Sequence, residues 1–136
     1  MPFYLDTSAL VRLVVDEPET QALFGWLSSE PWQPVACDLA RIELLRAVRR
    51  AAPDRMTQAR AALETVTLTQ VTTAVVEAAA RPEPWTLRTL DALHLASALD
   101  LGDDLEGLVT YDGRLADAAR YHGVGVVSPG GLPTLS

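Results

Sequence analysis

The stretch Phe3-Tyr4-Leu5-Asp6-Thr7-Ser8-Ala9-Leu10 decides the fold that this sequence predicts. Its first three residues form an apolar run that we interpret as a strand, and a helix over residues 8–15 follows at once. Asp6 therefore stands where the first strand ends. The same order, a short apolar strand and then a helix, recurs along the chain with short connections.

The pattern predicts four further strands, at residues 35–37, 66–69, 108–110 and 124–127. It predicts six further helices. One opens at Asp16 or Glu17 and ends near Ser29, and the other five lie at residues 39–52, 56–64, 72–80, 89–101 and 114–121. Asp38 is expected to cap the helix at residues 39–52. A loop through Pro82 and Pro84 and an irregular tail after Ser128 complete the chain.

This alternation predicts a single α/β domain over residues 1–136, with helices on both faces of a central parallel sheet. Ligand sites of such sheets form beyond the carboxyl ends of the strands. That edge is therefore where we look for functional residues.

Composition restricts the class of protein. Hydrophobic residues make up 49% of the chain and charged residues 21%, as in a compact globular domain. No apolar run reaches the roughly 18 residues of a membrane span, and the first residues lack the basic lead of a signal peptide. With Cys37 as the only cysteine, we expect no internal disulfide, a reducing cytoplasmic setting, and a small buried role for that residue.

The formal net charge is −7, and every basic side chain is an arginine. An acidic total argues against binding nucleic acid through a broad basic surface. It does not exclude a nuclease, because a bound metal can supply positive charge where a phosphate must lie. It also favours a basic protein partner.

Two acidic residues fall at the carboxyl edge of the predicted sheet. Asp6 follows the first strand directly, and Asp112 lies two residues beyond Thr110, the predicted end of the fourth strand. The alternative for each is ordinary turn or helix-cap chemistry, at which aspartate is effective.

Two more acids lie on predicted helices. Asp91 shares a helical face with apolar residues, and a buried carboxylate is costly unless it is paired, hydrogen-bonded or metal-bound. The alternative is a first-turn acid that favours the helix dipole, with Thr89 as the cap. Glu43 lies at the edge of an apolar face, and a salt bridge to Arg46 would also explain it.

A cluster of these four carboxylates would need a cation or protons. Carboxylates within about 4–6 Å repel by roughly 1–4 kcal/mol per pair at effective dielectrics of 80 to 20. Ligands that are all oxygen favour Mg²⁺ or Mn²⁺ over zinc. His94 and His122 have no metal-binding spacing, so we expect them to be ordinary polar or half-buried residues.

Four segments, in this order, resemble the PIN-domain ribonucleases, and specifically the VapC-like toxins of bacterial toxin–antitoxin pairs. The likeness covers essentially the whole chain. The segments are Tyr4-Leu5-Asp6-Thr7-Ser8-Ala9-Leu10, Ala40-Arg41-Ile42-Glu43-Leu44, Thr89-Leu90-Asp91-Ala92-Leu93-His94-Leu95-Ala96-Ser97-Ala98 and Thr110-Tyr111-Asp112-Gly113-Arg114-Leu115.

The resemblance implies an α/β/α sandwich with strand order 3-2-1-4-5. It implies that Mg²⁺ or Mn²⁺, as one or two ions, is held by the four acids Asp6, Glu43, Asp91 and Asp112. Ser8 and Thr110 would be accessory oxygens that steady an acid or a bound water. The implied substrate is structured RNA such as a tRNA or rRNA loop, the implied partner is a small antitoxin, and the family is often homodimeric. In one departure, Asp38 stands where the family commonly has a small hydroxyl residue.

Other functions for an acidic pocket on a parallel sheet fit less well. Receiver domains and haloacid-dehalogenase-like phosphatases both use a lysine, and this chain has none. The phosphatases also place a second aspartate two residues after the first, where Ser8 stands here. An RNA-processing nuclease without a toxin role, or an inactive binding module with the same fold, remains the alternative.

Overall fold

The computed structural model describes residues 1–81 and 87–133. In these residues, five strands form one parallel sheet in the order β3-β2-β1-β4-β5. The fold class and the strand order implied by the resemblance are both confirmed. The strands are β1 (Pro2–Leu5), β2 (Gln33–Cys37), β3 (Thr67–Thr69), β4 (Gly107–Val109) and β5 (Val126–Val127).

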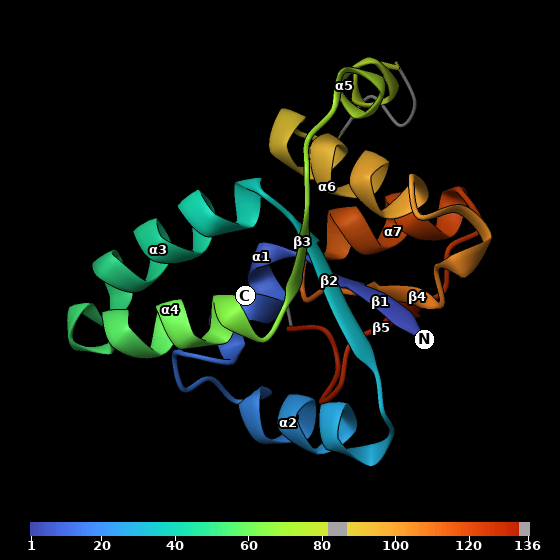
Figure 1. Ribbon diagram of the computed structural model, residues 1–136. Helices are drawn as coiled ribbons and strands as arrows, with labels where there is room; N and C mark the ends of the chain where they lie inside the picture. Colours follow the sequence, from blue (N-terminus) through green and yellow to red (C-terminus); the bar gives the residue numbers. More distant parts are fainter. Residues whose placement is uncertain (82–86, 134–136) are drawn as a thin grey trace.

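Helices cover both faces of the sheet, as Figure 1 shows. Helices α1 to α4 pack on one face, α6 and α7 pack on the other, and α5 packs against α6. The α-helices are α1 (Thr7–Arg12), α2 (Thr20–Ser29), α3 (Leu39–Ala51), α4 (Met56–Glu64), α5 (Thr73–Ala79), α6 (Thr89–Leu99) and α7 (Gly113–Tyr121).

Strand β1 lies in the middle of the sheet and divides the core. Phe3 and Leu5 pack with the side chains of α1 to α4, whereas Tyr4 packs with those of α6 and α7. This alternation follows from the two-residue period of a strand. A strand buried on both faces needs largely apolar side chains, which is why the first charged side chain, Asp6, comes directly after its carboxyl end.

The first two helices are shorter than the sequence predicted. Helix α1 ends at Arg12 and α2 begins at Thr20, so the chain between them turns where continued helix was expected. The Thr20 hydroxyl donates to the Arg12 carbonyl oxygen at 2.8 Å and accepts from the Glu17 N–H at 3.0 Å. These side-chain bonds stabilise the turn, which contains Pro18.

The predicted capping role of Asp38 is wrong. Its backbone is already helical, with φ −57° and ψ −26°, and its side chain makes no capping hydrogen bond. A capping side chain needs an extended backbone to reach back to the first turn. The carboxylate instead lies 3.6 Å from the Arg41 guanidinium.

Helix α6 is less enclosed than its apolar sequence suggested, since Leu90 and Leu99 are exposed. Its face toward the sheet, from His94 to Ala98, is buried. The predicted loop through Pro82 and Pro84 lies outside the described residues. Within the described residues, no helix is long and apolar enough to cross a membrane.

Candidate active site

Asp6 lies at the carboxyl end of β1, where its side chain is held on both oxygens. The residue is only 3% exposed. One carboxylate oxygen accepts from the Ser8 hydroxyl at 2.7 Å and from the Ala9 N–H at 3.1 Å, and the other accepts from the Thr110 hydroxyl at 2.7 Å. Burial raises the pKa of Asp6, and these hydrogen bonds oppose that rise without cancelling it.

The two predicted accessory hydroxyls join the first strand to the fourth. Besides donating to Asp6, Ser8 accepts from the Tyr111 N–H at 2.8 Å, and Thr110 accepts from the Asp112 N–H at 3.0 Å. Each hydroxyl therefore holds Asp6 and the backbone beyond β4 at once. Asp6 also caps α1 through the Ala9 N–H. The helix-cap role that the sequence analysis gave as an alternative is therefore present together with its place at the sheet edge.

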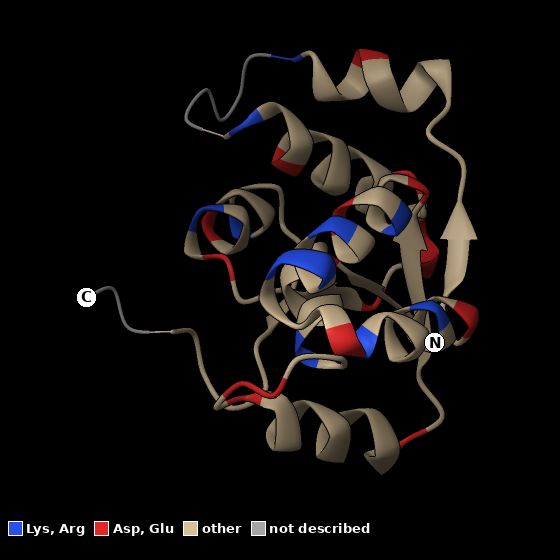
Figure 2. Cartoon of the chain, turned by 90° about the vertical axis from the view of Figure 1, so that its left-hand side faces the viewer, with Lys and Arg blue, Asp and Glu red and all other residues tan. Residues whose placement is uncertain are grey.

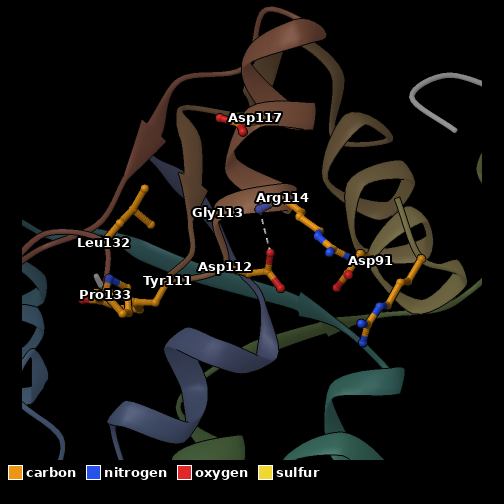
Figure 3. A pocket seen from close by; sticks show the side chains of 9 residues that line it. Asp91, Tyr111, Asp112, Gly113, Arg114, Asp117, Leu132 and Pro133 are labelled. Atoms are coloured by element: carbon orange, nitrogen blue, oxygen red, sulfur yellow. Dashed lines mark hydrogen bonds between the residues drawn. The ribbon is translucent and has the colours of Figure 1, made fainter. Parts of the chain in front are cut away.

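Asp112 also combines cap chemistry with a place at the sheet edge. One of its oxygens accepts from the backbone N–H groups of Arg114 at 2.9 Å and Leu115 at 3.1 Å, which caps α7. The side chain lines a cleft of about 600 Å³ that Asp91 also lines. In Figure 3 both carboxylates point toward the same space, and the side chain of Arg114 extends toward Asp91.

Asp91 lies in the first turn of α6 and is half-buried. Its pKa is raised, first by burial and then by repulsion from the Asp112, Asp6 and Glu43 carboxylates. All three of the other predicted acids are therefore close enough to act on Asp91 electrostatically. They come from the ends of β1 and β4 and from α3.

Glu43 is fixed by contacts that the sequence analysis did not anticipate. Its Oε1 accepts from the Thr7 hydroxyl at 3.0 Å and lies 2.6 Å from Nε2 of His94. On the other side of the ring, the Tyr4 hydroxyl lies 2.7 Å from Nδ1. The expectation that His94 is an ordinary polar or half-buried residue is wrong, because it is 1% exposed and contacts a predicted site residue.

His94 and Cys37 alter each other's acidity. Burial lowers the pKa of His94, but hydrogen bonds to Cys37 and Glu43 outweigh it and raise the pKa to about 10. Burial raises the pKa of the Cys37 thiol, but hydrogen bonds from His94 and Tyr4 lower it to about 7. Cys37 is fully buried at the end of β2, as expected.

One feature of the sequence could have indicated a role for His94, namely its spacing from Asp91 rather than from the other histidine. His94 lies three residues after Asp91, and residues three apart share one side of a helix. A histidine beside a buried carboxylate on an apolar helix is a candidate partner for a second carboxylate.

The four acids lie near one another but do not form a closed set of metal ligands. Within residues 1–81 and 87–133, no three His, Cys, Asp or Glu side chains lie together closely enough to hold a metal ion directly. The donor set is nevertheless all oxygen, as a hard cation prefers. Mg²⁺ commonly keeps several of its waters, which would bridge the remaining distance to the carboxylates.

The arginines are unevenly distributed. Residues 39–64 contain six of the chain's eleven arginines and only three acids. Figure 2 looks at the molecule from the side of α3 and α4 and shows arginine segments on these helices. The acidic total therefore conceals a concentration of exposed arginines in this stretch, namely Arg41, Arg46, Arg49, Arg50, Arg55 and Arg60.

Comparison with known proteins identifies the family. The family model of the PIN domain matches residues 3–121. Over 126 residues the chain is 43% identical to Ribonuclease VapC46 of Mycobacterium tuberculosis, a match that covers 93% of this chain and 96% of that protein. Ribonuclease VapC47 of the same species is 39% identical over 133 residues, which cover 95% of this chain and 98% of the relative.

Solved structures agree on the fold. VapC20 of Mycobacterium tuberculosis, described as a toxin that cleaves the sarcin–ricin loop, matches with a TM-score of 0.70 at 19% identity, over 85% of this chain and 94% of that one. A toxin–antitoxin complex from Klebsiella pneumoniae matches with a TM-score of 0.70 at 21% identity, over 93% and 96%. With the family model and the relatives, these findings show that the chain belongs to the PIN-domain family, among the VapC-like ribonucleases.

Proposed function

We propose that this protein is a ribonuclease toxin that hydrolyses phosphodiester bonds of structured RNA, such as a tRNA or rRNA loop, with Mg²⁺ or Mn²⁺. One observation carries the proposal: the Asp6, Glu43 and Asp112 carboxylates, which come from separate elements, lie close enough to Asp91 to add to the rise that burial causes in its pKa. Such repulsion is tolerated where a cation relieves it. The VapC ribonucleases among its relatives support RNA as the substrate.

The four acids divide the work in this proposal. Asp6 and Asp91 are direct metal ligands, and Glu43 and Asp112 hold a second ion or orient waters. A divalent ion in this place lowers the pKa of a bound water and stabilises charge on the phosphoryl oxygens. Because water attacks rather than the ribose 2′-hydroxyl, the products carry a 5′-phosphate and a 3′-hydroxyl.

Arginines beside the acids would bind the RNA backbone. Arg88 and Arg114 line the same cleft as Asp91 and Asp112. On α3, the exposed Arg46 and Arg50 follow Glu43 by about one and two helical turns. A guanidinium binds phosphate oxygens at two points, so these side chains would position the phosphodiester over the carboxylates.

The direct test measures cleavage of total RNA by the purified protein with Mn²⁺, with Mg²⁺ and with EDTA. We expect cleavage only with metal, and sequencing of the new 5′ ends identifies the site that is cut. The matched control is the Asp6→Asn/Asp91→Asn protein, in which both direct ligands are removed. Metal-independent cleavage, or equal cleavage by the control, would refute the assignment.

Metal binding has an independent readout in thermal stability. A ligand that binds only the native state stabilises it by RT ln(1 + [L]/Kd), which is about 2.7 kcal/mol at a hundredfold excess over Kd. Mn²⁺ should therefore raise the melting temperature of the parent and leave the Asp6→Asn/Asp91→Asn protein nearly unchanged. Equal shifts in both would place the ion elsewhere.

A small cognate antitoxin is the proposed regulator. A basic tail with an arginine would reach Asp91 and Asp112 in the open cleft and exclude metal and phosphate from it. Asp6 is already buried, so the tail would cover rather than contact it. Added Mn²⁺ should compete with the tail, and replacing its cleft-facing arginine by alanine should weaken inhibition. A complex that leaves the cleft open would refute this mode of inhibition.

The remaining features of the proposal are a single domain over residues 1–136, a homodimer in solution and a cytoplasmic location. Two alternatives remain: an RNA-processing nuclease without an antitoxin, and an inactive binding module. One measurement, growth after expression of the protein alone, distinguishes both from the main proposal. Expression of the active toxin alone should arrest growth, whereas neither alternative should do so.

A further inference from the structure

Glu43 is the predicted site residue whose restraint comes from side chains alone. Its side chain is 23% exposed, and both of its hydrogen bonds are made to Oε1, from Thr7 and from His94. No hydrogen bond from the described residues reaches Oε2. One oxygen is thus held by two hydrogen bonds, and the other has none from the described residues.

His94 is held as firmly as the carboxylate that it contacts. The Tyr4 hydroxyl lies 2.7 Å from Nδ1 and accepts from the Cys37 N–H at 3.2 Å. The Tyr4 and His94 rings also meet edge to face, with centroids 5.8 Å apart. A line of hydrogen bonds therefore runs from the backbone of β2 through β1 and α6 to Glu43 on α3.

The chemistry of Glu43 assigns a proton to Nε2. A carboxylate oxygen only accepts hydrogen bonds, so the 2.6 Å contact between Nε2 and Oε1 requires that Nε2 donates. The Tyr4 hydroxyl then donates to Nδ1 of a neutral ring or accepts from Nδ1 of a protonated one. In either state His94 donates to Glu43, and the ring cannot turn away without breaking its bond to Tyr4.

We propose that His94 is a positioning residue: with Tyr4 behind it, it holds the Glu43 carboxylate so that Oε2 faces the metal or the water that the metal binds. This inference rests on the proposed function, which assigns that role to Glu43. Partners that orient a ligating carboxylate are worth about 10–100-fold in metal affinity or activity. Without the Nε2 donor, Glu43 would rotate about its side-chain bonds, and the correct orientation would be only one of several.

The test compares His94→Phe, which keeps a ring but removes the donor, with His94→Gln, which keeps an amide N–H near Nε2. Mn²⁺ binding is measured by titration calorimetry, and RNA cleavage is measured against Mn²⁺ concentration. We expect His94→Phe to bind Mn²⁺ about 10–100-fold more weakly, with kcat reduced and the KM for RNA unchanged. His94→Gln should recover part of the loss.

Ser97→Ala is the matched control. Ser97 is buried on the same helix, one turn beyond His94, and its hydroxyl has no hydrogen-bond partner among the described residues. This change alters the buried side of α6 without touching the line to Glu43. It should leave Mn²⁺ affinity and the cleavage rate at the parental values.

Tyr4→Phe provides a second measurement if His94→Phe does not fold. It removes only the hydroxyl behind Nδ1 and should shift Mn²⁺ affinity in the same direction by a smaller factor. If His94→Phe and Tyr4→Phe, or whichever of them folds, keep the parental Mn²⁺ affinity and kcat, the positioning role is overturned while the ribonuclease assignment stands. A parent that neither binds Mn²⁺ nor cleaves RNA would instead overturn both.

Discussion

Asp6 and Asp91 have the same side chain, but the fold holds the Asp6 carboxylate much more firmly than that of Asp91. Asp6 is buried, and a total of three hydrogen bonds reach its two oxygens from Ser8, Ala9 and Thr110. Asp91 lies half-buried in an open cleft, where no described residue makes a hydrogen bond to its side chain and three carboxylates repel it. The fold therefore fixes the side chain of Asp6 with hydrogen bonds, whereas it brings three like charges toward Asp91.

The largest expected effect is on catalysis. Replacing either acid should lower the cleavage rate, but the two replacements should change the stability of the protein differently. Asp6→Asn and Asp91→Asn should each lower the cleavage rate at least about 100-fold, the upper end of what loss of an orienting partner costs. Without metal, Asp91→Asn should raise the melting temperature, because repulsion is relieved. Asp6→Asn should not, because its amide places a donor against groups that donate to Asp6. Rates above a tenth of the parental value would remove the residue from the ligand set.

The restraint on Asp6 should itself be measurable in Thr110→Val. The change keeps the shape of the side chain but removes the bond to Asp6 and the acceptor for the Asp112 N–H. Leaving buried groups unpaired costs about 1–3 kcal/mol, which should appear in the free energy of unfolding from urea denaturation. Thr69→Val is the control, because its hydroxyl makes only a 3.4 Å bond to the Ala36 carbonyl. Equal losses in the two variants would mean that Asp6 is not specially held.

The open cleft should show its role in the salt dependence of RNA binding. In an Asp6→Asn background that does not cleave, Arg88→Ser and Arg114→Ser should each weaken binding by less than about tenfold and reduce the slope of log K against log [salt] by up to about one. Arg120→Ser is the control on the helix of Arg114, and its side chain already lies 3.5 Å from Asp117. An unchanged slope would exclude contact between the cleft arginines and phosphate.

The smallest effect concerns pH. The pKa of Asp91 is raised in the native state, so between its ordinary value of 3.8 and the native value the folded protein binds more protons than the unfolded chain. Stability must then fall as pH rises through this window. Melting curves from about pH 4 to 8 should show a stronger decline for the parent than for Asp91→Asn. Parallel curves would mean that neither burial nor the neighbouring carboxylates raise the pKa of Asp91 in the native state.

The two acids also differ in how far the sequence could predict them. Asp6 follows an apolar strand directly, so its place at the carboxyl edge could be inferred from the pattern and its neighbours Ser8 and Thr110 from the resemblance. The turn before α2 could not, because it depends on one hydroxyl, that of Thr20, which reaches across to Arg12. The contact between His94 and Glu43 joins residues 51 positions apart, and no local periodicity carries such information.

The central place of β1 in the sheet has a consequence for how the protein is made. Its neighbours are β2 and β4, and the bond from Thr110 to Asp6 spans 104 residues. Pairings between such distant segments form slowly and only after both have been synthesised. While a ribosome is still translating the α6 segment, the nascent chain has Asp6 and Ser8 but neither the Thr110 hydroxyl that completes the restraint of Asp6 nor Asp112. The growing polypeptide should therefore be harmless to the RNA of the ribosome that makes it, and the nuclease should become competent only after the segment that contains β4 has emerged and docked.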